Sequence, residues 1–387
     1  MPKFSTYAIT LLIIFLFIFI ISKTKKNKYF IFFTVLLLSI MAFLFNPVKA
    51  WLTNGNYTDL YRYWSDMDVF STYGWNTSDS MFKTQYSVMP VTKLLIYFVS
   101  KIGIKRLLAC LSCLLVYGIF GYVLSNEAKE NKCSNKYLNM AFIIFIFLVN
   151  YKISITNIRM PIANSIFFLT LYNDLNKKNN MFFNIIGYIL CCSIHSAFLL
   201  FVGLRLILFL IHKYNGKLIY IFIILYGMSI TVITNILELY GSNSFVSSIL
   251  YKINYYTNGT GSTGMEYSIF MLGITKVLMM LYLIYILKNK ANIDSKNLMY
   301  KCTLLFTFFT IGSMINFHLF HRVTNFLIYF IVYWQLYLCS DNLSIYKYRL
   351  VNENRGYINL YNVICFLVVF IHIYYYFMSY QYNALTF

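Results

Sequence analysis

The stretch LLACLSCLLVYGIFGYVLS, residues 107–125, contains no charged residue and is long enough to cross a bilayer as a helix. Similar apolar runs occur at 4–22, 30–48, 138–152, 160–173, 182–194, 196–211, 218–237, 267–287, 302–317, 323–340 and 358–378. These runs lack the alternation of barrel strands, and only helices or closed barrels satisfy the backbone within lipid. The sequence therefore predicts an all-α polytopic membrane protein with about twelve transmembrane helices (11–13).

The composition excludes an ordinary soluble protein. Of 387 residues, 60% are hydrophobic and 11% are charged, whereas a soluble domain carries about 25% charged residues. The net charge of +20 is spread over short loops without a long basic tract, so we expect no nucleic-acid partner. The first run, 4–22, ends in SKTKK without a small-residue cleavage site, and we interpret it as a retained helix instead of a signal peptide.

The distribution of lysine and arginine predicts the orientation of the chain. Six loops that alternate with the apolar runs hold eighteen of these residues and are expected on the cytoplasmic side. They are 23–28, 126–136, 174–180, 212–217, 288–301 and 341–357. Both termini then face outside. This threading requires residues 182–211 to form a hairpin that turns near His195, although one long helix is the alternative.

Two long regions are expected outside the membrane, within a single integral membrane domain that spans residues 1–387. The first, 49–106, is a periplasmic loop in which we expect 90–104 to lie along the surface as an interfacial helix. The alternative is that 90–104 crosses the membrane, but Lys93 and Lys101 make it a poor span. The second periplasmic loop is 238–266. The tyrosines and tryptophans of the first loop are either interface anchors or platforms that stack on sugars.

Arg159 is the leading candidate for an anion-binding residue. It lies on the outer side, against the orientation bias, and opens the helix 160–173, with Pro161 in the first turn. A guanidinium beside a helix N-terminus favours a phosphate, and Lys152 is expected to join the same site. The alternative is an arginine that extends to lipid headgroups.

A second candidate is HLFHR, residues 318–322, between two strongly apolar runs. His318 and Arg322 are four residues apart and share a helical face. Without a third ligand, His318 and His321 are a weak metal signal, so we expect no metal and favour hydrogen bonding to a phosphate or a sugar. Packing is the alternative. Lys276, in the middle of an apolar run, is a weaker candidate for a residue that faces a cavity.

One candidate reaction, a glycosyl transfer that inverts the anomeric carbon, requires a group that accepts the proton of the acceptor hydroxyl and cations that stabilise the departing diphosphate. Asp66, in the aromatic segment YRYWSDMD, is our first choice among the acidic residues, ahead of Asp59 and Asp68. His195, in CCSIHSAFLL, is a second catalytic candidate, and a packing role is its alternative.

Taken together, these segments resemble the EpsG-like branch of the Wzy-type polysaccharide polymerases, which include O-antigen polymerases. The resemblance spans about residues 50–335 and rests on short motifs. They are NYTDLYRYWSDMDVF (56–70), YSVMPVTKLLIYFVSKIG (86–103), IRMPIANSIFFLTLY (158–172), IIGYILCCSIHSAFLLF (185–201) and HRVTNFLIYF (321–330).

The resemblance implies a GT-C-like membrane glycosyltransferase in the bacterial inner membrane, with an active site that faces the periplasm. Its substrate would be an undecaprenyl-diphosphate-linked oligosaccharide, polymerised into O-antigen or a related surface polysaccharide such as that of lipopolysaccharide. The essential outer arginines of the family match Arg159 and Arg322, and its His-Ser-Ala element matches His195. No cofactor is implied, membrane lipid surrounds the protein, and a chain-length regulator is the expected protein partner. A flippase for the lipid-linked glycan or an O-antigen ligase is the alternative.

Overall fold

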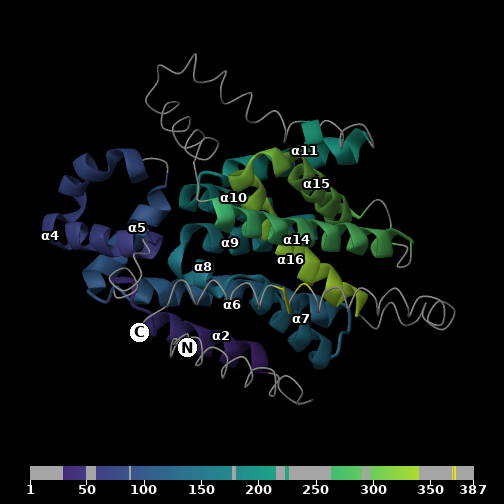
Figure 1. The fold of residues 1–387 in the computed structure, drawn as a ribbon, viewed down its shortest axis with the longest axis horizontal. Helices are drawn as coiled ribbons and strands as arrows, with labels where there is room; N and C mark the ends of the chain where they lie inside the picture. Colours follow the sequence, from purple (N-terminus) through teal and green to yellow (C-terminus); the bar gives the residue numbers. More distant parts are fainter. Residues whose placement is uncertain are drawn as a thin grey trace. The chain divides into compact units, whose positions relative to one another are not determined.

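The computed structural model describes residues 29–48, 58–86, 89–176, 180–214, 223–225, 263–289, 293, 297–339, 368, 370 and 371. Every regular element in these residues is a helix, which confirms the predicted all-α class (Figure 1). The predicted runs 4–22, 218–237 and 358–378 lie almost wholly outside the described residues, as does most of the loop 238–266.

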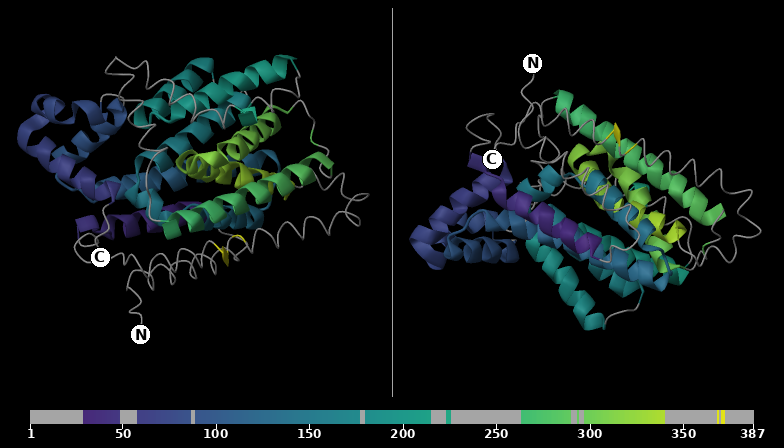
Figure 2. Two further views of the ribbon diagram at one scale, coloured as in Figure 1. Left: turned by 45° about the horizontal axis from the view of Figure 1, so that its top comes forward. Right: turned by 90° about the horizontal axis from the view of Figure 1, so that it is seen from below.

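The described helices follow the predicted apolar runs closely, and Figure 2 shows them from two further sides. They are α2 (Phe30–Leu44), α4 (Asp59–Tyr86), α5 (Pro90–Ile102), α6 (Leu107–Glu130), α7 (Asn135–Leu148), α8 (Tyr151–Thr156), α9 (Arg159–Leu175), α10 (Met181–Ile194), α11 (Phe198–Tyr214), α14 (Thr263–Asn289), α15 (Leu298–Gly312), the short 3-10 helix η1 (Ser313–Ile315) and α16 (Phe317–Leu338).

Three differences from the sequence-based expectation bear on the site. The run 138–152 is broken after Leu148, because Asn150 caps a separate helix, α8, by accepting a hydrogen bond from the backbone of Ile153 at 3.2 Å. The outer region 49–89 contains a helix, α4, which bends at Gly74, a residue with a φ of 73° that glycine adopts readily. The segment 318–322 lies within α16 and not between two helices.

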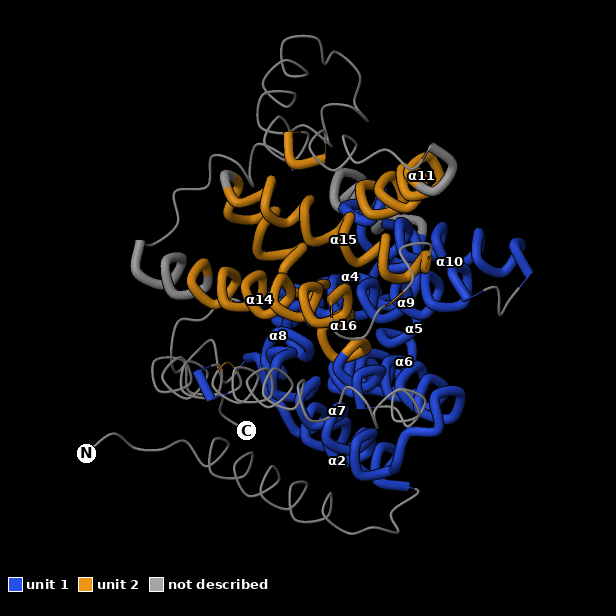
Figure 3. Tube along the Cα trace, turned by 90° about the vertical axis from the view of Figure 1, so that its right-hand side faces the viewer, with its two compact units in different colours: residues 1–199, 335–346, 369–387 blue, residues 200–334, 347–368 orange. Residues whose placement is uncertain are grey.

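The chain divides into two compact units, shown in different colours in Figure 3. Unit 1 comprises residues 1–199, 335–346 and 369–387, and unit 2 comprises 200–334 and 347–368.

In unit 1, α6 packs against α2, α7, α8 and α9. Its centre is fully buried at Phe120, whose ring lies 4.1 Å from that of Phe145 on α7. Ser112 of α6 donates a hydrogen bond to the carbonyl of Ser154 at 2.6 Å, so small polar groups hold α8 against α6. A side chain at Gly187 of α10 would come within 2.3 Å of the Thr170 hydroxyl on α9, so glycine permits this close approach.

In unit 2, α14, α15 and α16 pack through aromatic side chains. The rings of Phe306 and Phe326 lie 5.0 Å apart, and the indole of Trp334 donates a hydrogen bond to the Thr303 hydroxyl at 2.8 Å. Gly273 on α14 lies so close to Phe320 on α16 that an added Cβ would be 2.4 Å from the ring. The first turns of α16 are therefore fixed against the middle of α14.

Two described helices are long and apolar enough to cross a membrane, Leu107–Glu130 and the part of α14 from Phe270 to Asn289. Shorter apolar helices, such as α2 and α10, leave large side chains exposed, including Phe33 at 59% and Phe183 at 62%. Exposed apolar faces of this kind belong in lipid or against other protein. The described helices are therefore consistent with a helical membrane protein, and the twelve crossings and the GT-C-like architecture stay predictions.

Candidate functional site

Arg159 begins α9, as the sequence predicts, with Pro161 in the first turn. The preceding residue, Ile158, makes no side-chain capping hydrogen bond, and the backbone N–H groups of Met160 and Ile162 donate instead to the carbonyls of Asn157 and Ile158, at 3.3 and 3.2 Å. The Arg159 side chain is mostly buried, with 16% of its surface exposed. The Arg159 side chain therefore starts from the N-terminus of α9, in unit 1.

The carboxylate of Asp59, at the start of α4, is shared by two guanidinium groups. Its oxygens lie 3.1 Å from Nη2 of Arg62 and 3.5 Å from Nη2 of Arg159. Asp59 and Arg62 are three residues apart on one helix, whereas Arg159 comes from α9, a hundred residues away. The three side chains together carry an excess of one positive charge.

The ring of Tyr63 lies next to both guanidinium groups, with Cζ of Arg62 at 5.3 Å and Cζ of Arg159 at 5.7 Å from its centre. Burial raises the pKa of Tyr63 to about 12, so the phenol is neutral at physiological pH. Burial opposes the charge of Arg62, but the carboxylate of Asp59 and the Tyr63 ring raise the pKa of Arg62 above its usual value. Arg62 is therefore charged.

Two donors of this cluster are buried and unused. Within the described residues, Nε of Arg62 and Nε of Arg159 make no hydrogen bond. Among the described residues, Nη1 of Arg159 donates to the sulfur of Met89 at 3.0 Å, and a thioether sulfur is a weak acceptor. Buried donors are normally satisfied, so the cluster has spare capacity for an anionic ligand.

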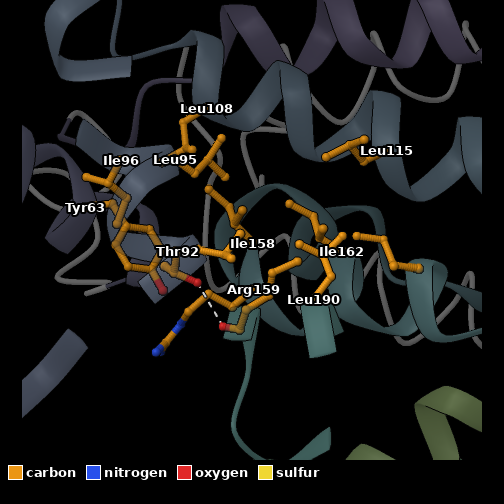
Figure 4. A pocket seen from close by; sticks show the side chains of 13 residues that line it. Tyr63, Thr92, Leu95, Ile96, Leu108, Leu115, Ile158, Arg159, Ile162 and Leu190 are labelled. Carbon is orange, nitrogen blue, oxygen red and sulfur yellow. Dashed lines mark hydrogen bonds between the residues drawn. The ribbon is translucent and has the colours of Figure 1, made fainter. Parts of the chain in front are cut away.

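An apolar pocket of about 260 Å³ adjoins Arg159 (Figure 4). Its walls come from α4, α5, α6, α9 and α10. They consist of Tyr63, Val91, Thr92, Leu95, Ile96, Leu108, Leu115, Ile158, Arg159, Ile162, Ile166, Leu190 and Ile194. In Figure 4 the guanidinium of Arg159 lies at one side of the pocket, beside Tyr63, and Leu115 lies at the far side. The arrangement suits a ligand with an anionic head and an aliphatic chain.

Asp66 is buried on a helix of the outer region. Asp66 lies on α4, seven residues after Asp59, and is 6% exposed. Its carboxylate accepts a hydrogen bond from the Tyr86 hydroxyl at 2.5 Å, which joins the two ends of α4 across the bend. Burial, then the charge and hydrogen bond of Asp66, raise the pKa of Tyr86. The described contacts thus give Asp66 a structural partner, and its catalytic role stays a prediction.

His195 lies at the break between α10 and α11, which confirms the predicted turn. Its backbone is extended, and its Nδ1 accepts a hydrogen bond from the backbone N–H of Ala197 at 3.2 Å. The preceding residue, Ile194, lines the pocket, and its carbonyl accepts a hydrogen bond from Thr92 of α5 at 2.8 Å. His195 therefore directly follows a residue of the pocket wall in the sequence, and 9% of its surface is exposed.

Lys152 is half-buried on α8, which packs against α4 and α6. It therefore belongs to unit 1 with Arg159, and its participation in the same site stays a prediction.

Arg322, His318 and His321 belong to unit 2, in the first two turns of α16. Asn316 caps this helix by accepting a hydrogen bond from the backbone of Leu319 at 3.0 Å. His318 and Arg322 keep the predicted spacing of four residues on one helix. The structure groups Arg322 with its own neighbours in unit 2, and a joint site with Arg159 stays a prediction.

Lys276 of α14 joins the histidine cluster through Asn325. Its Nζ donates to Oδ1 of Asn325 at 2.9 Å, and Nδ2 of the same amide lies 3.2 Å from Nε2 of His321. The imidazole of His321 stacks almost parallel on Phe317, at an angle of 8°. Burial, followed by the charges of Lys276, Arg322 and His318, lowers the pKa of His321.

Arg62, Tyr63 and Asn325 are functional candidates that the sequence alone does not single out. The spacing of Asp59 and Arg62 on one helical face was a local signal, but nothing local connects them to Arg159. Asn325 lies within an apolar run, and such a polar residue can be a helix-packing contact. Among the described residues, no group of three or more His, Cys, Asp or Glu side chains is placed to hold a metal ion.

Comparison of the chain with models of protein families, with curated proteins and with solved structures finds no match.

Proposed function

We propose that this protein is a membrane glycosyltransferase that polymerises undecaprenyl-diphosphate-linked oligosaccharide units on the outer face of the bacterial inner membrane. The growing glycan is transferred from its lipid diphosphate to a hydroxyl of the next lipid-linked unit. The bond between the anomeric carbon and the diphosphate oxygen breaks, a bond to the acceptor oxygen forms, and the acceptor proton passes to a base. The chain spans the membrane several times, and a chain-length regulator is its protein partner.

One observation carries the proposal: Arg159 lies at the side of an apolar pocket and has unused donor capacity. A polyprenyl diphosphate has this combination of a charged head and an aliphatic chain. The walls of Leu and Ile side chains suit part of the isoprenoid chain, because burial of apolar surface is favourable.

The charge of the cluster supports the same substrate. When the glycan leaves, negative charge develops on the diphosphate, and fixed cations in a water-poor site stabilise that charge. Arg159 and Arg62 provide two such cations and share a single counter-charge, Asp59. Arg322 provides a further cation in unit 2 for the same class of ligand.

A flippase of the lipid-linked glycan is the main alternative, and the buried Lys276 favours it, since ionisable residues inside transporter helices often mark ion or substrate pathways. A ligase that moves finished glycan to another acceptor would use a similar donor.

Deletion of the gene separates these functions. Loss of a polymerase leaves surface core carrying a single repeat unit on a gel, whereas loss of a flippase or a ligase leaves no repeat attached. Absence of the single-unit material would contradict the proposal.

The substitution Arg159→Lys tests the role of the guanidinium. Lysine keeps the charge but cannot bind a phosphate through two parallel hydrogen bonds. The loss of one charge-assisted hydrogen bond costs about 1.5–3 kcal/mol, so transfer should slow by roughly tenfold or more. Arg106→Lys, on the same predicted outer side at the start of α6, is the matched control and should give polymer of normal length. Normal polymer from Arg159→Lys would remove Arg159 from the site.

A further inference from the structure

Lys276 is a buried amine whose hydrogen bond goes to a neutral side chain. It is 5% exposed, in the part of α14 that is apolar enough to cross a membrane. Its Nζ donates to Oδ1 of Asn325 on α16 at 2.9 Å. A buried ammonium costs several kcal/mol of desolvation, so this contact calls for an explanation beyond packing.

The contact fixes the orientation of the Asn325 amide. In the structure Nζ of Lys276 donates to the carbonyl oxygen of Asn325, and the protonated amine, which can only donate, selects this orientation of the amide. The NH₂ group of the amide then faces the other way, toward His321, where Nδ2 lies 3.2 Å from Nε2.

The orientation of the amide in turn fixes the protonation of His321. The NH₂ group can only donate, so Nε2 of His321 must accept and carries no proton. A neutral imidazole with an unprotonated Nε2 holds its proton on Nδ1. The imidazolium form would set an N–H against an N–H and would add a positive charge near Lys276, Arg322 and His318.

We propose that Lys276 and Asn325 are positioning residues that hold His321 as a neutral imidazole with its proton on Nδ1. In this form His321, which is half-buried, presents one N–H donor to an oxygen of the substrate, from a phosphate or a sugar hydroxyl. This use of the donor rests on the proposed glycosyl transfer, whereas the tautomer itself follows from the three side chains alone.

The tautomer can be measured in the intact protein. Histidines labelled with ¹⁵N in the purified, detergent-solubilised full chain give separate signals for protonated and unprotonated ring nitrogens, and His321→Gln identifies the signals of His321. We expect His321 to be neutral, with the proton on Nδ1, from pH 5.5 to 7.5. A proton on Nε2, or an imidazolium at pH 6.5, would overturn the proposal.

Two variants test the chain of contacts. In Asn325→Asp the carboxylate only accepts, so Nε2 of His321 should become protonated while the shape of the side chain is retained. In Lys276→Met the amide can rotate and offer its oxygen to His321, so the form with the proton on Nε2 should appear. Lys276→Arg keeps a donor and should preserve the wild-type signals. Lys288→Met, at the exposed end of α14, is the matched control and should change nothing.

A transfer assay then separates the tautomer from the proposed function. Asn325→Asp and Lys276→Met should shorten the polymer, and Lys276→Arg should restore it. If the signals of His321 change as expected but polymer length does not, the positioning of His321 stands and its use in transfer is wrong. If the signals are the same in all variants, Lys276 and Asn325 do not position His321.

Discussion

Replacement of Asp59 by asparagine should lower the stability of the folded protein and raise its affinity for a diphosphate. Asp59→Asn removes the counter-charge shared by Arg62 and Arg159 and leaves two cations next to the Tyr63 ring. The folded protein should become less stable because the cations repel. The same change should strengthen the binding of a diphosphate, because Asp59 no longer competes with the ligand for the guanidinium groups.

The distances and exposures set the size of both effects. The two ion pairs measure 3.1 and 3.5 Å, and the Asp59 side chain is 32% exposed, so solvent screens them substantially. Partly exposed pairs contribute about 0.2–1 kcal/mol each, which predicts a loss of about 1 kcal/mol in the free energy of unfolding. Removal of a negative charge about 4 Å from a bound phosphate contributes up to about 4 kcal/mol at an effective dielectric constant of about 20, and less where water enters. We expect about 1.4 kcal/mol, which is a tenfold lower Kd.

The assay uses the purified full chain in detergent. Thermal unfolding followed by tryptophan fluorescence reports stability, and titration with farnesyl diphosphate reports binding. Asp68→Asn is the matched control on the same helix, because Asp68 is 65% exposed and pairs with Lys105 instead. It should leave the affinity for farnesyl diphosphate unchanged and lower the free energy of unfolding by less than Asp59→Asn does, because it breaks one exposed ion pair instead of two partly buried ones. Unchanged or weaker binding by Asp59→Asn would refute the reasoning, since Asp59 would then not compete for the arginines.

Two further substitutions test the pocket and the helix contacts. Leu115→Trp fills the side of the pocket far from the guanidinium, so it should weaken binding of farnesyl diphosphate at least tenfold and leave binding of inorganic diphosphate unchanged. Leu114→Trp, on the exposed face of α6, is the control and should bind both ligands normally. Equal binding of farnesyl diphosphate by the two variants would exclude the pocket as the binding site. Gly187→Ala brings a methyl group within 2.3 Å of Thr170 and should lower the free energy of unfolding, measured by denaturation in detergent, by about 1–3 kcal/mol. Gly203→Ala, with nothing within 4 Å of the added methyl group, is the control and should be neutral or stabilising. Equal stability of the two variants would contradict the close approach of α9 and α10.

The sequence predicted what depends on local hydropathy and local breaks. The run 107–125 became the core of α6, α9 starts at Arg159, and the helices part at His195, because each feature is encoded by neighbouring residues. The break at Asn150 was missed, since a capping asparagine inside an apolar run leaves the hydropathy almost unchanged.

Contacts between distant segments could not be predicted in the same way. The pairing of Asp59 with Arg159 depends on the packing of α4 beside α9, and hydropathy carries no information about partners a hundred residues apart. The same holds for Lys276 and Asn325, which the packing of Gly273 against Phe320 brings together. Asp66 shows the same limit: nothing in its segment YRYWSDMD indicates that Tyr86, twenty residues later, donates a hydrogen bond to it.

The sharing of Asp59 by two arginines also has a kinetic consequence for the proposed reaction. Once the glycan departs, the lipid diphosphate carries more negative charge than the substrate did, so the cluster with its excess positive charge holds the product more tightly than the substrate. The same cations that speed cleavage therefore slow the exchange of spent lipid for a fresh one. Turnover in the proposed reaction is then expected to be limited by product release, and rising salt, which weakens the binding of the product, should speed steady-state turnover before it slows it.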